Sequence, residues 1–248
     1  MIEAIIETAI EAGEKILGYY NEEIEVTSKL DESPLTKADL AAHYHIVGKL
    51  KELDPETPVI SEESGVPDYE ERKYWNKFWI VDPLDGTKEF IKKNGEFTVN
   101  IALIEDGEPV LGVVYAPAMD LLYYGTKASG SFKRTGDDKP HQIYSSAANK
   151  SKPLKIIESR SHGSSELEEY LQKEGIIVED RVKSGSSLKI CLVADGTADL
   201  YPRLAPTMEW DVAAGDAVFR YSAKEGNHES GIKYNKENLL NSSFVIGF

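Results

Sequence analysis

The sequence predicts an α/β protein, because short apolar segments typical of strands are interspersed with segments of helical periodicity. The first twenty residues place an apolar stripe along one side of an amphipathic helix. Two short apolar runs, residues 58–61 and 78–81, are typical of buried strands, and each is followed at once by acidic residues. Strand-like and helical segments then alternate over residues 155–201. A chain of 248 residues can form one large domain or two modest ones around a full core.

Turn and cap signals divide the chain into elements. Asp106-Gly107 predicts a hairpin with a slightly longer loop, whereas residues 130–139 are polar and rich in turn formers, and residues 145–152 could link two subdomains. Thr36 or Asp39 would cap the second helix. In chain order we expect helix 1–20, strand 24–30, a turn at 31–34, helix 35–50, strand 58–61, strand 78–82, helix 87–90, strands 97–104, 110–115 and 121–124, strand 155–159, helix 164–173, strand 176–179, helix 186–194, strand 199–201, and a helix from residue 211 to 218 with small residues for close packing.

The segment from Phe78 to Phe90 brings two carboxylates to the end of a strand. Pro83 cannot donate to a sheet, so the strand should end at about Asp82. Asp85 lies on the other side of the turn, and Gly86 can adopt backbone conformations closed to other residues. Thr87 is expected to cap a short helix. Free backbone N–H groups at that helix start would then face Asp82 and Asp85.

Close carboxylates repel one another unless a cation stands between them. Helix N-terminal amides attract phosphate oxygens, and Mg²⁺ is often held by one or two carboxylates together with a substrate phosphate. The segment therefore suggests metal-assisted transfer of a phosphoryl group to water. The alternative is a polar turn with a capping threonine, since Asp, Pro, Gly and Thr are common turn residues.

Two other acidic positions strengthen the first interpretation. Glu62 and Glu63 follow the strand at 58–61, as Asp82 follows its own strand. Asp211 begins a segment rich in small residues that should form a helix. Each has an ordinary explanation as well: a solvated loop for the two glutamates, and a favourable helix-dipole interaction for Asp211.

Composition excludes several classes of partner. A formal charge of −15 argues against binding nucleic acid through the general surface and against attachment to anionic membranes. Apolar content of 41% is ordinary for a globular protein, and no apolar run is long enough to cross a membrane. The single cysteine, Cys191, lies in an apolar run, so we expect a buried structural thiol and no intrachain disulfide. These features predict a soluble cytoplasmic protein.

Three ordered segments resemble the signatures of the magnesium-dependent, lithium-sensitive inositol monophosphatase superfamily: Glu62-Glu63, Asp82-Pro-Leu-Asp-Gly-Thr87 and Trp210-Asp-Val-Ala-Ala-Gly215. Narrower matches resemble its CysQ-type 3′(2′),5′-bisphosphate nucleotidases, and they are Asp85-Gly-Thr-Lys-Glu-Phe-Ile91, Asn94-Gly-Glu-Phe-Thr-Val-Asn-Ile-Ala102, Ser159-Arg-Ser-His162, Gly185-Ser-Ser-Leu-Lys189 and Leu200-Tyr-Pro-Arg203. The likeness extends from the first helix to the final strand.

The resemblance implies a layered αβαβα sandwich and hydrolysis of adenosine 3′,5′-bisphosphate to AMP and phosphate, with a sulfur nucleotide as a second substrate. Two or three Mg²⁺ ions per site are implied. The matched ligands of the ions are Glu62, Asp82, the backbone carbonyl of Leu84, Asp85 and Asp211. The matched pair that positions and deprotonates the attacking water is Asp39 and Thr87. The matched contacts to substrate are Gly86, Thr87, Ser186, Lys189, Arg203 and Asp211.

An enzyme for a bisphosphate must also recognise the phosphate that it does not cleave. Ser186, Lys189 and Arg203 offer a hydroxyl and two cations for this purpose; without the resemblance, a solvated lysine and an ion-paired arginine would explain the two cations as well. His162 could act as a general base, but its motif favours contacts to substrate or a structural role.

Three functional hypotheses remain open at this point. The first is a nucleotide 3′-phosphatase, the second a phosphatase of inositol monophosphate or fructose 1,6-bisphosphate, and the third a nucleotide-binding sensor without catalysis. We expect residues 1–248 to form one phosphatase unit, monomeric or homodimeric. Within it, residues 1–148 would carry the metal and catalytic motifs, and residues 149–248 the nucleotide-side contacts and the last metal ligand.

Overall fold

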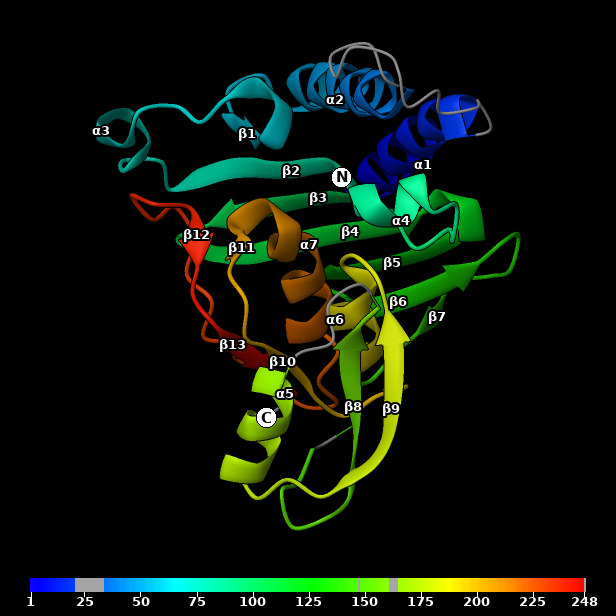
Figure 1. Cartoon of the computed structure of the whole chain (residues 1–248). Coiled ribbons are helices and arrows are strands. Elements are labelled where there is room, and N and C mark those ends of the chain that lie inside the picture. The colour runs from blue at the N-terminus through cyan, green and yellow to red at the C-terminus, as the bar shows by residue number, and fades with distance from the viewer. Residues whose placement is uncertain (21–33, 147, 161–164, 248) are drawn as a thin grey trace.

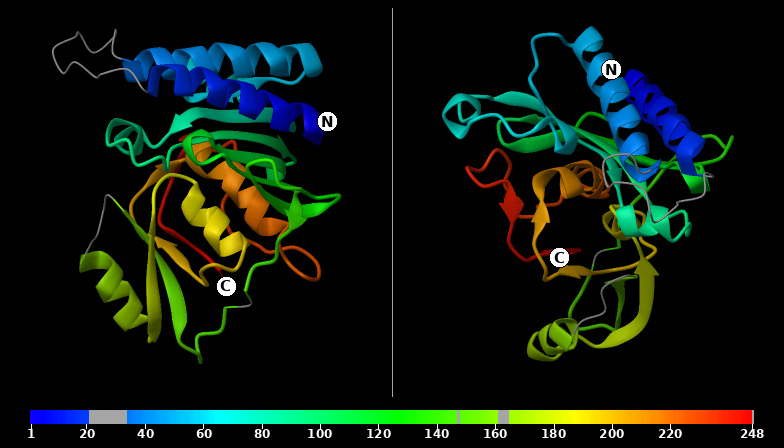
Figure 2. Two further views of the ribbon diagram at one scale, coloured as in Figure 1. Left: turned by 90° about the vertical axis from the view of Figure 1, so that its right-hand side faces the viewer. Right: turned by 45° about the horizontal axis from the view of Figure 1, so that its top comes forward.

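Five layers of secondary structure stack in the computed structural model of the protein, which describes residues 1–20, 34–146, 148–160 and 165–247. Figure 1 and both views of Figure 2 show two long helices on one face of a large sheet and two shorter helices on the other face. A smaller group of strands and one more helix lie beyond them. The layers are, in order, helices α1 (Ile2–Tyr20) and α2 (Pro34–Leu53), the large sheet, helices α6 (Leu188–Ala194) and α7 (Glu209–Arg220), strands β8 (Leu154–Ser159), β9 (Val178–Ser184) and β10 (Tyr201–Arg203), and helix α5 (Ser165–Lys173). The predicted αβαβα sandwich of the α/β class is confirmed.

Seven strands follow one another across the large sheet in their order along the chain. They are β1 (Val59–Ser61), β2 (Lys77–Asp85), β3 (Thr98–Glu105), β4 (Glu108–Ala116), β5 (Leu121–Thr126), β6 (Gly130–Thr135) and β7 (His141–Gln142). β1 and β2 are parallel, and every later pair is antiparallel. The predicted hairpin at Asp106-Gly107 is confirmed, but the expected longer loop was wrong: Glu105 pairs with Glu108, so these two residues form the whole loop, and both have the positive φ angles that a two-residue turn requires.

Alternation of side chains along β2 explains how the sheet makes two cores. Trp79 and Val81 pack in the cluster that contains the buried faces of α1 and α2. Phe78 and Ile80 point the other way, into the cluster that contains α6 and α7. On this second face the backbones come very close, because a Cβ added at Gly112 of β4 would lie 2.4 Å from the carbonyl oxygen of Ala214 in α7. The small residues of α7 therefore allow close packing, as predicted.

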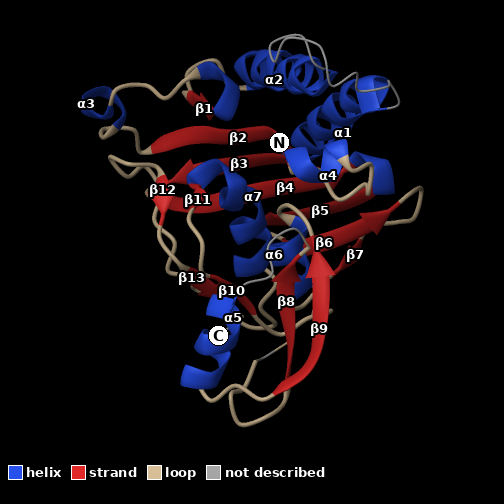
Figure 3. Ribbon diagram, viewed as in Figure 1, coloured by secondary structure: helices blue, strands red, loops and turns tan. Residues whose placement is uncertain are grey.

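The second half of the chain adds the lower layers seen in Figure 3. β8 and β9 form a parallel pair, and Leu167 and Leu171 of α5 pack on β8. The N–H of Ile157 donates to the carbonyl of Leu200 at 2.8 Å, which joins β8 to the segment leading into β10. The remaining elements are 3₁₀ turns Glu62–Ser64 and Pro117–Met119, helices α3 (Tyr69–Arg72) and α4 (Thr87–Ile91), and strands β11 (Thr207–Met208), β12 (Leu240–Asn241) and β13 (Phe244–Ile246).

Several predicted boundaries were wrong. The polar segment at 130–139 contains strand β6, which is paired on both sides and stacks Phe132 on Tyr124; its mixed burial hides the strand pattern. Strand β9 runs to Ser184 instead of ending at residue 179, again with mostly exposed side chains. α2 begins at Pro34, so neither Thr36 nor Asp39 caps it. The expected strand at 24–30 and His162 lie outside the described residues.

Candidate active site

The parallel pairing of β1 and β2 brings the first two acidic segments together. Ser61 is in register with Val81, so the next residues, Glu62 and Asp82, leave the two strands side by side. Because β1 and β2 are parallel, the acids that follow Ser61 and Val81 lie at the same end of the strand pair. Sequence position thus places Glu62 beside Asp82 once the register is known.

A β-bulge in β2 brings Asp85 toward the same side. Asp82 pairs with Asn100 and Asp85 with Thr98, so three steps on β2 match two steps on β3. In a regular strand, residues three apart would face opposite sides, and the extra residue cancels that alternation. Pro83 lies within the bulge, where a missing N–H is tolerated, and the N–H of Leu84 donates to Oδ1 of Asp82 at 3.1 Å. The strand therefore continues to Asp85 instead of ending at Asp82 as predicted.

Helix α7 supplies the fourth carboxylate, Asp211. It begins at Glu209 instead of at Asp211, and Oδ2 of Asp211 accepts the N–H of Met208 at 2.8 Å. Asp211 therefore lies in the first turn, as its helix-dipole explanation requires, and this hydrogen bond to the N-cap residue also fixes the direction of its side chain. Oxygens of Glu62, Asp82 and Asp211 lie within 4.8 Å of one another. Such a group of hard oxygen donors fits a divalent cation.

Burial and mutual repulsion raise the pKa values of these carboxyl groups. Burial raises the pKa of Asp82 well above its usual range, and the charges of Asp85, Glu62 and Asp211 raise it further. Burial and Asp85 raise the pKa of Asp211 to about 7. Burial and the charges of Glu63 and Glu62 raise the pKa of Asp39 to about 8. Without a cation, the group is a cluster of repelling charges, so the residues present fit a metal site.

The metal-free protein is expected to lose stability as the pH rises from about 5 to about 8. The folded-state pKa values of Asp39 and Asp211 lie above 3.8, so the native state holds extra protons, and their stabilising effect is lost as the pH rises through about 7 and about 8. Carboxyl groups with lowered pKa values, such as Asp54, change the stability of the protein only at lower pH. Thermal unfolding in EDTA at several pH values in this range measures how the unfolding temperature changes with pH.

Two comparisons make that slope specific to the carboxylate group. Asp82→Asn should flatten the pH dependence, because one of the interacting carboxyl groups is gone. Saturating Mg²⁺ should flatten it in the wild type. If the midpoint of thermal unfolding in EDTA rose with pH, it would contradict the conclusion that these buried carboxylates repel one another.

The turn after β2 has a different cap from the one predicted. Gly86, at φ 96°, is the N-cap residue of α4, and Thr87 is the first residue inside the helix. A side chain at position 86 would be strained, and its Cβ would lie 3.2 Å from the Cα of Phe97. The chain therefore turns tightly here, with Gly86 and Thr87 directly after Asp85.

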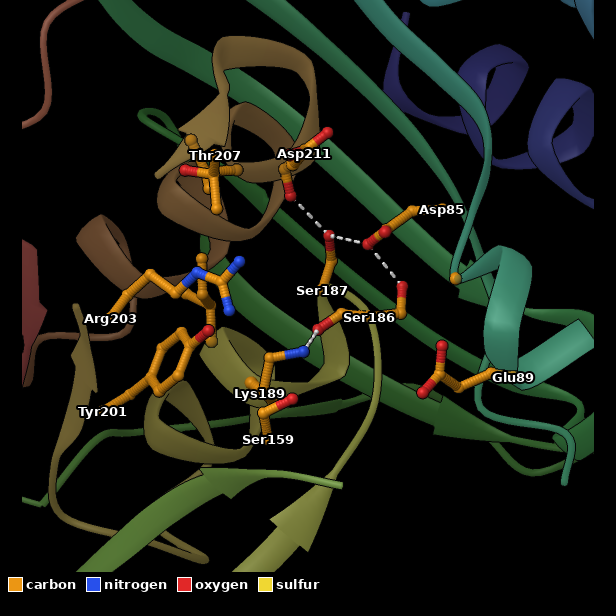
Figure 4. Close-up of a pocket in the computed structure, with 13 residues that line it drawn as sticks. Asp85, Glu89, Ser159, Ser186, Ser187, Lys189, Tyr201, Arg203, Thr207 and Asp211 are labelled. Atoms are coloured by element: carbon orange, nitrogen blue, oxygen red, sulfur yellow. Dashed lines mark hydrogen bonds between the residues drawn. The ribbon is translucent and has the colours of Figure 1, made fainter. Parts of the chain in front are cut away.

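A cavity of about 140 Å³ lies next to Asp85 and Asp211, and Figure 4 shows the residues that line it. Six of the predicted site residues line it: Asp85, Gly86, Ser186, Lys189, Arg203 and Asp211. Glu62 and Asp82 join Asp211 in the carboxylate group instead. Asp39, Leu84 and Thr87 belong to neither set, although the charge of Asp39 contributes to the raised pKa of Asp82.

The cavity wall opposite Asp85 is cationic. Lys189 is only 8% exposed, its Nζ donates to the carbonyl of Ser186 at 2.6 Å, and burial lowers its pKa to about 8. Arg203 and Thr207 each have a buried polar atom, Nε and Oγ1, without a hydrogen-bond partner among the described residues. The wall thus offers donors for an anionic or polar ligand.

Sequence reasoning missed several polar residues around Asp85. Ser159, Tyr201 and Thr207 line the cavity, and buried Thr98 and Asn100 lie behind the loop of Ser186 and Ser187. Thr98 and Asn100 alternate with apolar residues inside an otherwise apolar strand, a spacing that could have shown that both point to the same interior site. Cys191, in contrast, is buried in the core as predicted, and burial raises the pKa of its thiol.

Comparison with known proteins gives one consistent result. The model of the inositol monophosphatase family matches residues 1–221. The chain is 48% identical over 252 residues to the 3′(2′),5′-bisphosphate nucleotidase CysQ of Escherichia coli K12, covering 99% of both chains. It is 34% identical over 249 residues to the protein of the same name from Haemophilus influenzae, covering 99% of this chain and 92% of that one.

Solved structures agree. The crystal structure of CysQ from Bacteroides thetaiotaomicron has a TM-score of 0.84 at 44% identity, covering 99% of this chain and 96% of that one. An inositol monophosphatase from Zymomonas mobilis has a TM-score of 0.77 at 21% identity, covering 99% and 91%, and supports the fold alone. Among the described residues, no helix combines the length and hydrophobicity needed to cross a membrane. The family match over most of the chain, together with relatives aligned from end to end, shows that this chain belongs to the inositol monophosphatase family.

Proposed function

We propose that the protein is a magnesium-dependent phosphatase that removes the 3′-phosphate of adenosine 3′,5′-bisphosphate in the cytoplasm, giving AMP and phosphate. One observation carries the proposal: a single cavity is lined by the carboxylates Asp85 and Asp211 and also by the cations Lys189 and Arg203. A metal-bound phosphate and a second phosphate could occupy these two sides. Full-length similarity to relatives named 3′(2′),5′-bisphosphate nucleotidase supports the same substrate.

The carboxylate group is assigned to Mg²⁺, with two or three ions per site. Oxygens of Glu62, Asp82, Asp85 and Asp211 and the carbonyl of Leu84 would hold the ions. Mg²⁺, when bound, would neutralise the charge of the scissile phosphate and of the departing oxygen. Asp82 is the natural centre of this set, because the charges of Asp85, Glu62 and Asp211 all act on its carboxyl group.

Asp39 and Thr87 are assigned to the attacking water. As the water oxygen bonds to phosphorus and the bond from phosphorus to the 3′ oxygen breaks, Thr87 would accept a proton from the water and pass its own to Asp39, and the departing 3′ oxygen would take a proton from solvent to become the hydroxyl of AMP. Contact between α2 and α4 supports this pairing.

The phosphate that is not cleaved is assigned to Ser186, Lys189 and Arg203, while Gly86, Thr87 and Asp211 would contact the scissile side. The Ser186 hydroxyl already donates to Asp85 at 2.5 Å, so Lys189 and Arg203 would supply the charge. This arrangement also fits one phosphatase unit with subdomains 1–148 and 149–248. Residues from both halves share one core cluster, Ile60 and Phe78 with Ile157 and Leu188, and both halves line the cavity.

Lys189→Met is expected to raise KM for the bisphosphate by about 10- to 100-fold, the effect of losing a charged hydrogen bond. Turnover of inositol monophosphate, which lacks a second phosphate, serves as the control and should change little. Folding should survive, because the buried ammonium is bonded to a carbonyl and not to a carboxylate. An equal loss of kcat/KM for both substrates would show that Lys189 does not bind the phosphate that is not cleaved.

The same lysine predicts a pH dependence of substrate binding. Because burial lowers the pKa of Lys189 to about 8, the free enzyme loses this positive charge as the pH rises through that value. KM for the bisphosphate should therefore increase between pH 7 and pH 9 in the wild type, with a pKa of about 8. Lys189→Met should remove this component. A wild-type KM that stays constant over this range would contradict the assignment.

The test of the function is release of phosphate from adenosine 3′,5′-bisphosphate, with and without Mg²⁺, with the nucleotide product identified by chromatography. We expect Mg²⁺-dependent release with AMP as the product. Adenosine 3′-phosphate as the product would mean that the 5′-phosphate is cleaved and that the orientation proposed here is reversed. Absence of release at any Mg²⁺ concentration would reject the proposal.

A further inference from the structure

The hydroxyl of Ser187 connects two of the carboxylate residues. Its Oγ lies 2.6 Å from the backbone carbonyl oxygen of Asp211 and 3.0 Å from Oδ2 of Asp85. The side-chain amide of Asn100 donates to the same Oγ at 2.9 Å. Ser187 is 3% exposed. One buried hydroxyl therefore contacts the end of β2, the middle of β3 and the first turn of α7, as the dashed lines to Asp85 and Asp211 in Figure 4 show.

Asp85 receives a second hydroxyl at the same oxygen. Ser186 Oγ donates to Oδ2 of Asp85 at 2.5 Å, and Thr98 Oγ1 lies 2.5 Å from Ser186 Oγ. Thr98 is fully buried. Ser186 has a φ of 50°, a region that non-glycine residues seldom occupy. The backbone of the loop is thus held in an unfavourable conformation that directs two successive hydroxyl groups at one carboxylate oxygen.

The number of hydrogens in this network shows why Ser187 matters. The Asn100 amide supplies a hydrogen to Ser187 Oγ, so the hydrogen of the serine itself is available to Asp85 or to the Asp211 carbonyl. Removing the hydroxyl would leave the buried Asn100 donor without this acceptor. It would also leave Oδ2 of Asp85 with the Ser186 hydroxyl alone. Both losses are costly in a buried site.

We propose that Ser187 is a positioning residue for the metal site: through its contacts with Oδ2 of Asp85 and with the backbone carbonyl of Asp211, it fixes the Asp85 carboxylate and the first turn of α7 relative to each other. The inference rests on the proposed function for the identity of the site. Partners that orient a ligand carboxylate typically change metal affinity by about 10- to 100-fold when they are removed. Ser187 lines the same cavity, but in this role its hydroxyl acts through Asp85 and the first turn of α7.

The test measures binding of Mn²⁺, which replaces Mg²⁺ and gives an electron paramagnetic resonance signal, in the full-length protein without substrate. Ser187→Ala should weaken Mn²⁺ binding by at least about tenfold. Ser187→Thr, which retains the hydroxyl, should restore most of the affinity. Ser222→Ala is the matched control, because Ser222 is also fully buried and its Oγ donates to one backbone carbonyl, that of Phe219, at 2.8 Å. The control should bind Mn²⁺ like the wild type.

A second variant keeps the test decisive if Ser187→Ala does not fold. Thr98→Val preserves shape and removes the hydroxyl that supports Ser186, so it should also weaken Mn²⁺ binding. Thermal unfolding in EDTA identifies the variants that fold. Wild-type Mn²⁺ affinity in any folded variant that lacks one of these two hydroxyl groups would overturn the proposal.

Kinetics separate this inference from the proposed function. In Ser187→Ala the Mg²⁺ concentration for half-maximal rate should rise, while KM for the nucleotide at saturating Mg²⁺ should stay near the wild-type value. If the wild type releases no phosphate from the bisphosphate but Mn²⁺ binding still falls in Ser187→Ala, the function is wrong and the positioning role stands. If the wild type is active but Mn²⁺ binding is unchanged in Ser187→Ala, the function stands and the positioning role of Ser187 is wrong.

Discussion

Asp82→Asn is expected to reduce kcat on the order of 10³-fold or more, as loss of several kcal/mol of charge stabilisation at a metal site would. Asp82 is 1% exposed, and the charges of Asp85, Glu62 and Asp211 all act on it. An amide keeps the shape of the side chain but removes the negative charge that would hold the cations. Steady-state kinetics at saturating Mg²⁺ measures the effect.

The same substitution should not unfold the protein. Removing one of several repelling buried charges should leave the unfolding midpoint in EDTA unchanged or higher at neutral pH. Asp180→Asn, at an exposed position on β9, is the control for the change from aspartate to asparagine, and it should match the wild type in both measurements. A normal kcat in Asp82→Asn would show that the metal site has been misassigned.

Asp39→Asn and Thr87→Ala should each lower kcat by about 10²- to 10⁴-fold, the contribution of general base catalysis. They are proposed to act as one unit, so the double variant should be scarcely slower than the slower of the two single variants. Thr87→Ser retains a hydroxyl and should keep much of the activity. The measurement is a double-mutant cycle on kcat at saturating Mg²⁺ and nucleotide.

The cycle has a clear contrary outcome. If the losses in Asp39→Asn and Thr87→Ala multiply, the two residues act independently and the proton does not pass between them. If Thr87→Ala retains full activity, the hydroxyl takes no part in deprotonating water, and Asp39 would have to act alone.

The position of the carboxylates at the ends of β1 and β2 was largely predictable, because it follows from nearby residues in the sequence. Pro83 and Gly86 restrict the backbone, and acids directly after two apolar runs predict carboxylates at strand ends. The register of β1 and β2 then places Glu62 next to Asp82. Fold class followed for a similar reason, since alternating periodicities of helix and strand survive in the sequence. The resemblance added Asp39 and the ligand role of Leu84, which no local pattern indicates.

Long-range register could not be predicted. The bulge between Asp82 and Asp85 depends on how β2 pairs with β3, and Pro83 alone indicated an end to the strand instead. The hydroxyl groups around Asp85 come from β3 and from residues 186–187, about a hundred positions later. Strand β6 was missed because its side chains show no clean alternation of burial. In each case the deciding contact joins residues far apart in sequence.

The most direct test of the central claim is the ratio of kcat/KM for adenosine 3′,5′-bisphosphate to that for inositol monophosphate and for fructose 1,6-bisphosphate, measured at one saturating Mg²⁺ concentration. The cations Lys189 and Arg203 in the cavity predict a large preference for the nucleotide over inositol monophosphate, which has no second phosphate. Similarity to relatives named 3′(2′),5′-bisphosphate nucleotidase predicts that the nucleotide is also preferred over fructose 1,6-bisphosphate. Preference for either sugar ester would contradict the nucleotide assignment while keeping the metal site, and binding of the nucleotide without any phosphate release would indicate a sensor.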